Sequence, residues 1–558
     1  MEKIFIGVAW PYVSGYRHIG HVAGFGVPCD IFARYHRLMG NKVLMVSGSD
    51  MHGTPIMVKA DAEGKTPAEV AGFYHEVLAD NLRTLGFSYD LYTTTETDNH
   101  KATVQDFFLT LLKRGYIYTE TTKQLYCPND KRFLADRYVE GTCPFCKYDN
   151  ARGDQCDECG RPIDPLELID PQCKLCGETP EVRETEHFFL DLPKLRSRLD
   201  DYAKAHVDVW RANVTQFTEN LLKESLRGRA ITRDIPWGVK VPVAGYEDKV
   251  IYVWFDAVIG YLSATKEWAE HQGTPDSWRE WWEDKDVKSY YFIGKDNIVF
   301  HTVIWPAMLM AYGDDRFNLP YDVVSTEFLT MEGRQLSGSR GHAIWLPDYL
   351  SRYDPDPLRF YLTINAPETR DSDFSWGEFV RRNNDELVAK WGNFVNRVLS
   401  FTHKNFEGRV PSPGELAAED NELLATVDRT FGAVGELIAA RRFKDSIKDL
   451  MALWDTANVW IDKSAPWKVI KTDRARAATT LWTAFQAISG MKTLAVPYMP
   501  TTSQKCHELL GLQGHAASGR WHRDPIPAGQ AFPQPAPLFK KLDEKVVDEE
   551  IARMKGQG

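Results

Sequence analysis

Hydrophobic and polar residues alternate in blocks along the chain, and these blocks have the lengths of strands and helices. Segments 3–10 and 41–50 are short apolar runs of the kind that form buried strands, and a helical pattern follows each of them. The same order returns at 249–264 and 289–310. A strand–helix repeat of this kind predicts an α/β domain with a parallel sheet.

The pattern changes after residue 376, where apolar residues recur every three or four positions. This spacing predicts a bundle of α-helices. The run "VPSPGE" from Val410 separates two of these helices, and a proline-rich stretch at 523–539 leads into a charged helix at 540–555. The residues expected to form the bundle core are Leu387, Trp391, Phe394, Val398, Leu424, Val427, Phe431, Val434, Ile438, Leu450, Leu453, Trp454 and Ala457.

Composition describes an ordinary globular protein with several domains. The 558 residues are 43% hydrophobic and 26% charged, and the formal net charge is −11. An acidic chain of this kind does not coat nucleic acid nonspecifically. The apolar N-terminal segment is short, is broken by Pro11 and lacks a basic leader, and no apolar run is long enough to span a bilayer. We therefore expect a cytoplasmic protein with no membrane partner.

Cysteines cluster in a segment that interrupts the α/β pattern between about residues 116 and 230. Seven of the nine lie between Cys127 and Cys176. Two CxxC pairs with a short spacer can close a tetrahedron of thiolates around one structural Zn²⁺; these are Cys143, Cys146, Cys156 and Cys159. An outer set offers three thiolates and one carboxylate, and since carboxylate is the harder donor we expect weaker zinc binding; this set is Cys127, Asp130, Cys173 and Cys176.

The segment "PYVSGYRHIGHVAG" follows the first strand and opens the first helix, where unpaired backbone N–H groups favour an anion. His18 and His21 are three residues apart, so both rings can reach the same phosphate chain. Gly20 leaves room for a flat base to approach the backbone. On spacing alone, two surface histidines at a helix start are an equally good interpretation.

With its neighbours, this segment resembles the ATP-binding signature of class I aminoacyl-tRNA synthetases. The segments "SGSDMHGTPI", "RFLADRYVEGTCPFC", "ARGDQCDECG", "EHFFLDL", "YVWFDAVIGY" and "FIGKDNIVFH" are similar to the methionyl-tRNA synthetase family, in its order, from Ile4 to about Trp467. The resemblance implies that L-methionine and Mg²⁺-bound ATP give methionyl-adenylate, which is then transferred to tRNA(Met). A rival synthetase for isoleucine, leucine or valine needs a large editing domain, for which the insertion leaves no room.

The resemblance also implies a division of the chain into functional segments. These are the first half of a Rossmann-like catalytic domain (1–115), a connective insertion with zinc knuckles (116–230), the second catalytic half (231–325), a stem-contact segment (326–380), an α-helical anticodon-binding domain (381–520), and a connector with a C-terminal helix (521–558). No appended C-terminal tRNA-binding domain of the kind that dimerises some relatives is present in the sequence, so we expect a monomer.

An amino-acid pocket is the third candidate site. Trp254, Ala257 and Tyr261 share one helix face, although an aromatic stripe is more often core than pocket. The resemblance implies that Asp50 anchors the substrate ammonium, and Trp10 departs from the smaller apolar residue of several relatives. The methionine-binding residues implied are Trp10, Tyr12, Asp50, Trp254, Ala257, Tyr261, Asn297, Ile298 and His301.

Nucleotide and anticodon sites are implied by the resemblance as well. Lys295 is expected near the phosphates and Asp296 near the ribose. The ATP-binding residues implied are Tyr12, His18, Gly20, His21, Gly294, Asp296, Leu336, Ser337, Gly338 and Ser339. Asn393 and Arg397 share a helix face and, with Trp467, are expected to contact the anticodon. Without the resemblance, these three would be a surface polar pair and a packed tryptophan.

One loop departs from the family pattern. "MEGRQLSGSRGH", from Met331 to His342, stands where the family has its KMSKS loop, yet both lysines are replaced, by Gln335 and Gly338. We expect Arg334 or Arg340 to supply the missing cation, and we expect His18, His21 and Lys295 to complete the catalytic set. The alternative is a paralogue that binds tRNA or adenylate with weak or no aminoacylation.

Overall fold

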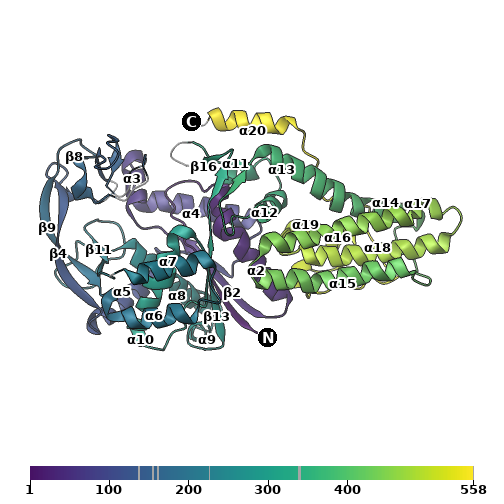
Figure 1. Cartoon of the computed structure of the whole chain (residues 1–558), viewed down its shortest axis with the longest axis horizontal. Coiled ribbons are helices and arrows are strands. Elements are labelled where there is room, and N and C mark those ends of the chain that lie inside the picture. Colours follow the sequence, from purple (N-terminus) through teal and green to yellow (C-terminus); the bar gives the residue numbers. More distant parts are fainter. Residues whose placement is uncertain are drawn as a thin grey trace.

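The computed structural model describes residues 1–556 except 136–137, 154–155, 157, 160–162, 225 and 337–340. An α/β body occupies the middle of an elongated molecule, with the cysteine-rich insertion at one end and a helical bundle at the other (Figure 1). The α/β pattern stops at residue 116 and resumes beyond residue 230, so the two halves of the body lie far apart in sequence. They lie side by side in space, because their strands share one sheet.

Five parallel strands form the central sheet in the order β14–β13–β1–β2–β3. Side chains of β1 alternate between two apolar cores: Ile4, Ile6 and Val8 face one core, and Phe5 faces the other. The parallel sheet expected from the apolar runs is confirmed, as is the Rossmann-like fold that the resemblance implies. The strands are β1 (Lys3–Val8), β2 (Lys42–Ser49), β3 (Leu91–Thr94), β13 (Val287–Gly294) and β14 (Asp322–Thr326).

Helices connect these strands and cover both faces of the sheet. The helix that follows β1 starts as α1 (Ile19–His21), continues through a π-helical stretch at Val22–Gly26 and ends as α2 (Val27–Leu38). The remaining helices of the α/β body are α3 (Thr54–Glu63), α4 (Pro67–Thr84), α5 (Asp98–Lys113), α8 (Val253–His271), α9 (Arg279–Trp282) and α10 (Trp305–Gly313). A short hairpin, β11 (Thr232–Arg233) with β12 (Val250–Ile251), precedes α8.

The insertion is built on a long antiparallel pair, β4 (Ile117–Cys127) and β9 (Glu181–Leu190). Its outer part buries its own small core, which includes cysteines of both predicted metal sets. The other elements between residues 116 and 230 are β5 (Arg132–Phe133), β6 (Val139–Thr142), β7 (Ala151–Arg152), β8 (Ile169–Cys173), α6 (Arg196–Ala205), α7 (Ala212–Lys223) and β10 (Arg229–Ala230).

A mixed segment joins the body to the bundle. It contains β15 (Leu329–Met331), β16 (Arg334–Gln335), α11 (Leu346–Leu350), α12 (Pro355–Ile364), β17 (Ser372–Phe374) and α13 (Trp376–Arg382). The bundle follows with a π-helical stretch at Asn383–Gly392 and then α14 (Asn393–Asn405), α15 (Ala418–Ala439), α16 (Phe443–Ser464), α17 (Pro466–Val469), α18 (Arg474–Ala495) and α19 (Pro500–Leu509). All the apolar residues expected in its core are buried, which confirms the predicted bundle.

The last part of the chain returns along the bundle and then to the body. Within the proline-rich stretch, Ile526, Phe532 and Leu538 are buried against the bundle core. The charged terminal helix is α20 (Lys545–Gly556), which lies next to α13 (Figure 1). Among the described residues, no helix combines the length and the apolar character needed to cross a membrane.

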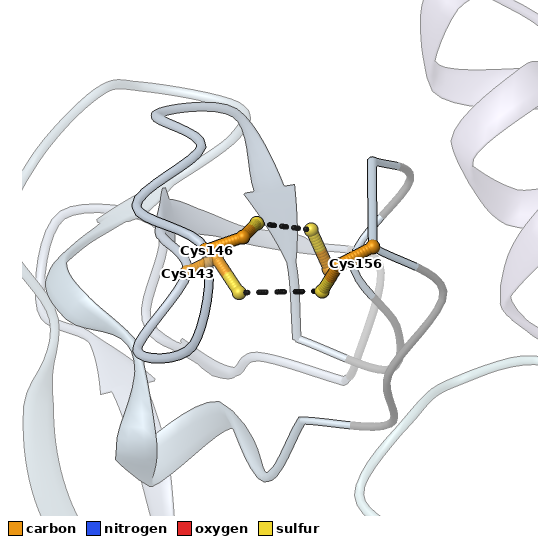
Figure 2. A group of neighbouring side chains, drawn as sticks. Cys143, Cys146 and Cys156 are labelled. Carbon is orange, nitrogen blue, oxygen red and sulfur yellow. Dashed lines mark hydrogen bonds between the residues drawn. The ribbon is translucent and has the colours of Figure 1, made fainter.

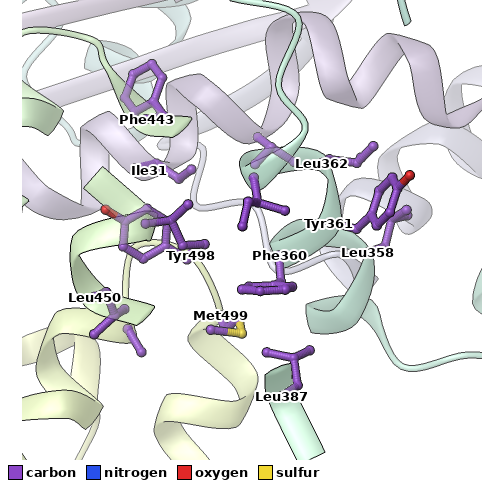
Figure 3. Packing of buried hydrophobic residues seen from close by; sticks show 14 of the residues in the cluster. Ile31, Leu358, Phe360, Tyr361, Leu362, Leu387, Phe443, Leu450, Tyr498 and Met499 are labelled. Carbon is purple, nitrogen blue, oxygen red and sulfur yellow. The ribbon is translucent and has the colours of Figure 1, made fainter. Parts of the chain in front are cut away.

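One continuous core joins the α/β body to the bundle. Figure 3 shows Ile31 of α2, Phe360 of α12, Phe443 and Leu450 of α16, and Tyr498 in this core. The residues come from segments hundreds of positions apart, so the bundle packs directly onto the body through a shared core.

A fully buried ion pair crosses this core. Arg359 of α12 donates from NH2 to Oδ2 of Asp30 on α2 at 2.7 Å, and neither side chain is exposed. The same guanidinium donates to the backbone carbonyls of Leu85, Pro497 and Tyr498. Although burial opposes it, the adjacent arginines lower the pKa of Asp30 below its ordinary value. The Asp30 carboxylate is therefore charged, and the Arg359 guanidinium donates to it directly.

Arg359→Met should destabilise the protein strongly, because it leaves the Asp30 charge and three carbonyls buried without this donor. Removing one partner of a buried pair costs about 3–5 kcal/mol. Urea unfolding at pH 7 measures the loss. Arg83→Gln is the control, since Arg83 and its partner Asp80 are 75% and 69% exposed and such a pair contributes about 1 kcal/mol or less. A loss for Arg359→Met no larger than that of the control would contradict the assignment.

Candidate active site

A cavity of about 630 Å³ lies at the carboxyl ends of the sheet strands. Ligands of open α/β sheets bind at this edge, where the strand order reverses, and here the reversal falls between β1 and β13. Trp10 and Tyr12 enter the wall after β1, Asp50 after β2, and Gly294 and Thr326 at the ends of β13 and β14. Segments that are separate in sequence therefore meet because parallel strands end together.

The segment His18–His21 forms one wall of this cavity. The backbone N–H of Gly20 donates to Nδ1 of His18 at 3.2 Å, which leaves Nε2 as the donor of the neutral ring. Burial and then the neighbouring charge of Arg17 lower the pKa of His18 to about 3, and burial also lowers the pKa of His21. A Cβ at Gly20 would lie 2.8 Å from Cδ1 of Leu336, so glycine allows the two walls to approach.

Asp50 lines the cavity and is 3% exposed. Its Oδ1 accepts the backbone N–H of His52 at 3.1 Å. Burial and then the nearby Asp256 carboxylate raise the pKa of Asp50 well above its ordinary value. A cation bound beside Asp50 would reverse this shift by stabilising the charged carboxylate.

A buried polar network that the sequence analysis missed lies behind Asp50. Asp256 accepts from Nδ1 of His52 and Nε2 of His100, both at 2.5 Å, and Nε2 of His52 donates to Glu96 at 2.8 Å. Although burial opposes it, the Asp256 carboxylate raises the pKa of His52 to about 10. His52 lies in "DMHG" and Asp256 in "WFDA", so the residues were visible in the sequence. Their contacts were not, because His100 and His52 lie 156 and 204 positions from Asp256.

An aromatic pocket opens beside Asp50. Trp254, Ala257 and Tyr261 line it from one face of α8, as their spacing predicted. Nδ1 of His301 donates to the carbonyl of Asn297 at 2.9 Å, so Nε2 accepts the Tyr261 hydroxyl at 2.8 Å. Burial lowers the pKa of His301 to about 4, which keeps this ring neutral.

Trp10 fills the space next to this pocket. A Cβ at Gly48 would lie 2.3 Å from the Trp10 ring, and one at Gly260 would lie 2.7 Å from it. Gly48 and Gly260 therefore make room for the Trp10 ring, at a position where several relatives have a smaller residue. Ile298, which was also expected to contact methionine, is buried in the core beside the cavity. Tyr12 meets Trp254 edge to face, with ring centroids 6.0 Å apart.

The three residues of the "GKD" segment after β13 differ in what they contact. Gly294 and Asp296 line the cavity, and burial raises the pKa of Asp296. The ammonium of Lys295 instead donates to Glu327 at 2.7 Å and to Asp371 at 3.1 Å. The positive charge of Lys295 is therefore compensated by carboxylates in this structure.

The loop at 331–342 contributes Gln335 and Leu336 to the cavity wall. Arg334 lies in β16, is exposed, and places NH2 3.5 Å from Nδ1 of His342. The other residues predicted for this loop lie outside the described part of the chain; they are Ser337, Gly338, Ser339 and Arg340.

Another arginine, which the sequence analysis did not assign, lines the cavity. Arg17 immediately precedes His18, and its NH1 lies 3.4 Å from Nε2 of His21. It carries a positive charge on the same wall as the two histidines. Its position in "SGYRHIGH" offered no signal beyond being basic.

Both predicted metal sets are brought together in the insertion. Within each set the ligand atoms all lie within 4.8 Å of one another, so either set could hold a metal ion. Figure 2 shows Cys143, Cys146 and Cys156 with their sulfur atoms converging. Cys146 and Cys156 are 3.5 Å apart at sulfur, as are Cys127 and Cys176 of the outer set, and Cys173 donates to Asp130 at 3.0 Å.

The three residues expected at the anticodon lie together on the bundle. The Arg397 guanidinium is 4.3 Å from the Trp467 ring centroid, and its NH2 donates to Asp462 at 2.6 Å. Asn393 is exposed and lies one turn before Arg397 on α14. Trp467, at the start of α17, is only partly buried.

Known proteins resemble this chain over its whole length. A family model described as class I tRNA synthetases (M) matches residues 4–399, and one described as the anticodon binding domain of methionyl tRNA ligase matches residues 410–558. The methionine–tRNA ligase of Chloroflexus aggregans is 52% identical, covering 100% of this chain and 99% of that protein. That of Thermobifida fusca is 49% identical, covering 99% and 98%. A crystal structure of Mycobacterium tuberculosis methionyl-tRNA synthetase bound by methionyl-adenylate matches with a TM-score of 0.79 at 25% identity, covering 97% of this chain and 100% of that one.

Proposed function

The chain belongs to the methionine–tRNA ligases, a family of class I tRNA synthetases, and we propose that it activates methionine in the cavity at the carboxyl ends of β1, β2, β13 and β14. The enzyme forms methionyl-adenylate and pyrophosphate from L-methionine and ATP, and a terminal hydroxyl of tRNA(Met) then attacks the adenylate. One observation carries the proposal: a buried carboxylate, an aromatic pocket and the His18–His21 segment line the same cavity. A paralogue without efficient aminoacylation is not supported by full-length relatives named as ligases.

Asp50 is the residue we assign to the methionine ammonium. It is buried, and a cation beside it would lower the pKa that burial raises. The rings of Trp254 and Tyr261 beside it suit a polarisable thioether, which makes favourable contacts with aromatic rings. The neutral His301 fixes the orientation of the Tyr261 hydroxyl. The pocket thus combines one charge for the ammonium with apolar contacts for the side chain.

The nucleotide lies, in this proposal, between the His18–His21 segment and the "GKD" segment. His18 offers Nε2–H to a phosphate oxygen, Asp296 faces the ribose, and Gly20 lets the base approach. Mg²⁺ accompanies ATP and neutralises part of its charge. Little covalent chemistry is required of the protein, which aligns the methionine carboxylate with the α-phosphate and stabilises the charge that develops there.

Zinc fits the inner cysteine set. Four sulfur atoms within 4.8 Å of one another match a closed tetrahedral Zn²⁺ site, which stabilises folding and leaves no position for a substrate. The outer set has the same spacing, with a carboxylate from Asp130 in place of one thiolate. We propose that it holds a second zinc ion more weakly.

We further propose that the bundle binds the tRNA anticodon through Asn393, Arg397 and Trp467. The exposed amide and the stacked Arg–Trp pair offer edge contacts and a ring surface for an unstacked base. We propose the domain limits that the resemblance implies, which are 1–115, 116–230, 231–325, 326–380, 381–520 and 521–558. A monomer acting in the cytoplasm is part of the same proposal.

Purified protein should catalyse methionine-dependent exchange of pyrophosphate into ATP, and Asp50→Asn should abolish most of this activity. Losing the carboxylate from a buried charge pair costs about 2–5 kcal/mol. Because burial raises the pKa of Asp50, and only the charged carboxylate attracts the ammonium, methionine affinity of the wild type should rise with pH through that pKa. Titrations of tryptophan fluorescence with methionine at a series of pH values measure both effects. Unchanged affinity in Asp50→Asn would show that the ammonium binds elsewhere.

Protein purified without added zinc should contain about one to two equivalents of zinc, since thiolate sets retain the metal more tightly than mixed sets. Cys146→Ser should remove the tightly held ion and lower the melting temperature, whereas Cys176→Ser should affect only the weaker one. Elemental analysis before and after dialysis against a chelator gives the counts. A zinc-free preparation with unchanged stability would contradict both assignments.

Trp467→Ala should leave the exchange reaction almost intact while it weakens charging of tRNA. Stacking of a base on an aromatic side chain contributes about 1–3 kcal/mol, so the KM for tRNA should rise roughly tenfold or more. Val459→Ala, at an exposed apolar residue of α16, is the control. If exchange falls as much as charging does, Trp467 is a packing residue.

A further inference from the structure

Among the described residues predicted for the site, none places an unpaired positive charge in the cavity. Its described wall includes the acidic side chains of Asp50, Asp296 and Glu327. Lys295 is held between Glu327 and Asp371, and burial keeps His18 and His21 neutral near pH 7. ATP and the methionine carboxylate would both bring negative charge into this space. An uncompensated negative charge in a buried site is strongly unfavourable.

Arg17 has the geometry to supply this charge. Within the described part of the chain, its Nε and NH2 nitrogens are buried and have no hydrogen-bond partner, and no carboxylate forms an ion pair with it. Among the described residues, the one polar partner of this guanidinium is Nε2 of His21, 3.4 Å from NH1. Burial lowers the pKa of Arg17 to about 10, so the guanidinium remains charged at neutral pH. A buried charge with free donors is costly unless a ligand pairs with it.

The position of Arg17 limits what that ligand can be. The guanidinium is beside His21, on the wall assigned to the nucleotide, and close enough to Asp50 to influence its pKa. Asp50 is assigned to the methionine ammonium, so Arg17 faces the region where the carboxylate of methionine meets the phosphate that it attacks. Both groups are oxyanions, and the planar fork of arginine binds either one in a bidentate manner.

We propose that Arg17 is a substrate-binding residue that pairs with an oxyanion, either the methionine carboxylate or a phosphate of ATP, at this junction. The inference rests on the proposed function, because it presumes that both substrates occupy the cavity. In this proposal, Arg17 places a positive charge next to the His18–His21 segment. The 331–342 loop lacks the two lysines of the family loop, which are replaced by Gln335 and Gly338. Arg17 acts by direct contact and stabilises the anion more strongly as charge accumulates during adenylate formation.

Kinetics of pyrophosphate exchange test the proposal with Arg17→Gln and Arg17→Lys. Arg17→Gln removes the charge, and kcat/KM should fall by about a hundredfold or more, as expected when a charged donor to a reacting oxyanion is lost. Arg17→Lys keeps the charge without the fork and should recover part of the rate. Arg83→Gln, at an exposed arginine outside the cavity, should match the wild type. Melting temperatures of all variants show whether each one is folded.

Binding of methionine and of methioninol, in which a primary alcohol replaces the carboxylate, separates the two anions. If Arg17 pairs with the carboxylate, Arg17→Gln weakens methionine binding by about tenfold or more and leaves methioninol unchanged. If it pairs with a phosphate, both ligands bind as before, while the KM for ATP rises or kcat falls. Either result supports the proposal.

Two results would overturn it. One is an exchange rate for folded Arg17→Gln within about threefold of the wild type, far below the loss expected for a missing charged donor. The other is an equal loss of methionine and methioninol binding with unchanged ATP kinetics, which would mean that Arg17 serves only to balance Asp50. A wild type without methionine-dependent exchange overturns the proposed function itself, so the two failures are distinguishable.

Discussion

The buried pair between Asp30 and Arg359 fixes the relation between the two functional ends of the molecule. Asp30 lies on α2, which continues without a break from the His18–His21 segment of the cavity. Arg359 lies on α12 and also holds the carbonyls of Pro497 and Tyr498, just beyond α18 of the bundle. Movement of the bundle against the body would leave charged and polar groups buried without partners. The cavity and the bundle are therefore held at one spacing by packing and hydrogen bonds.

The sequence was sufficient for the fold because the signal for burial is local. Ile4 and Ile6 alternate with Phe5 in a strand, and Val427 and Val434 repeat at helical spacing. These periods depend only on neighbouring residues, so they predicted the sheet and the bundle before any long-range contact was known. The cysteine sets were predictable for the same reason, since each CxxC pair is a local pattern whose chemistry requires the second pair.

The charges of the site could not be predicted in this way. His18 is neutral because of burial, and Lys295 is compensated by Glu327 and Asp371, which lie 32 and 76 positions away. The expectation that these residues share the cationic role with an arginine of the 331–342 loop followed from family position alone. Within the described part of the chain, the structure also shows a guanidinium without an ion pair, that of Arg17, one residue before His18. Electrostatic roles depend on depth and on distant partners, and neither is encoded in a short motif.

The cavity holds two buried ionisable groups of opposite kind, the Asp50 carboxyl and the Arg17 guanidinium. In the described part of the chain, Asp50 and Arg17 influence each other's pKa but form no ion pair. The Arg17 guanidinium is charged, and an ammonium bound beside Asp50 would favour the charged form of its carboxyl. Methionine is a zwitterion with one group for each of them. Binding energy gained at Asp50 fixes the ammonium and thereby places the carboxylate on the Arg17 side, next to the nucleotide wall. The separation of the two charges thus converts affinity for the substrate into orientation for attack on ATP.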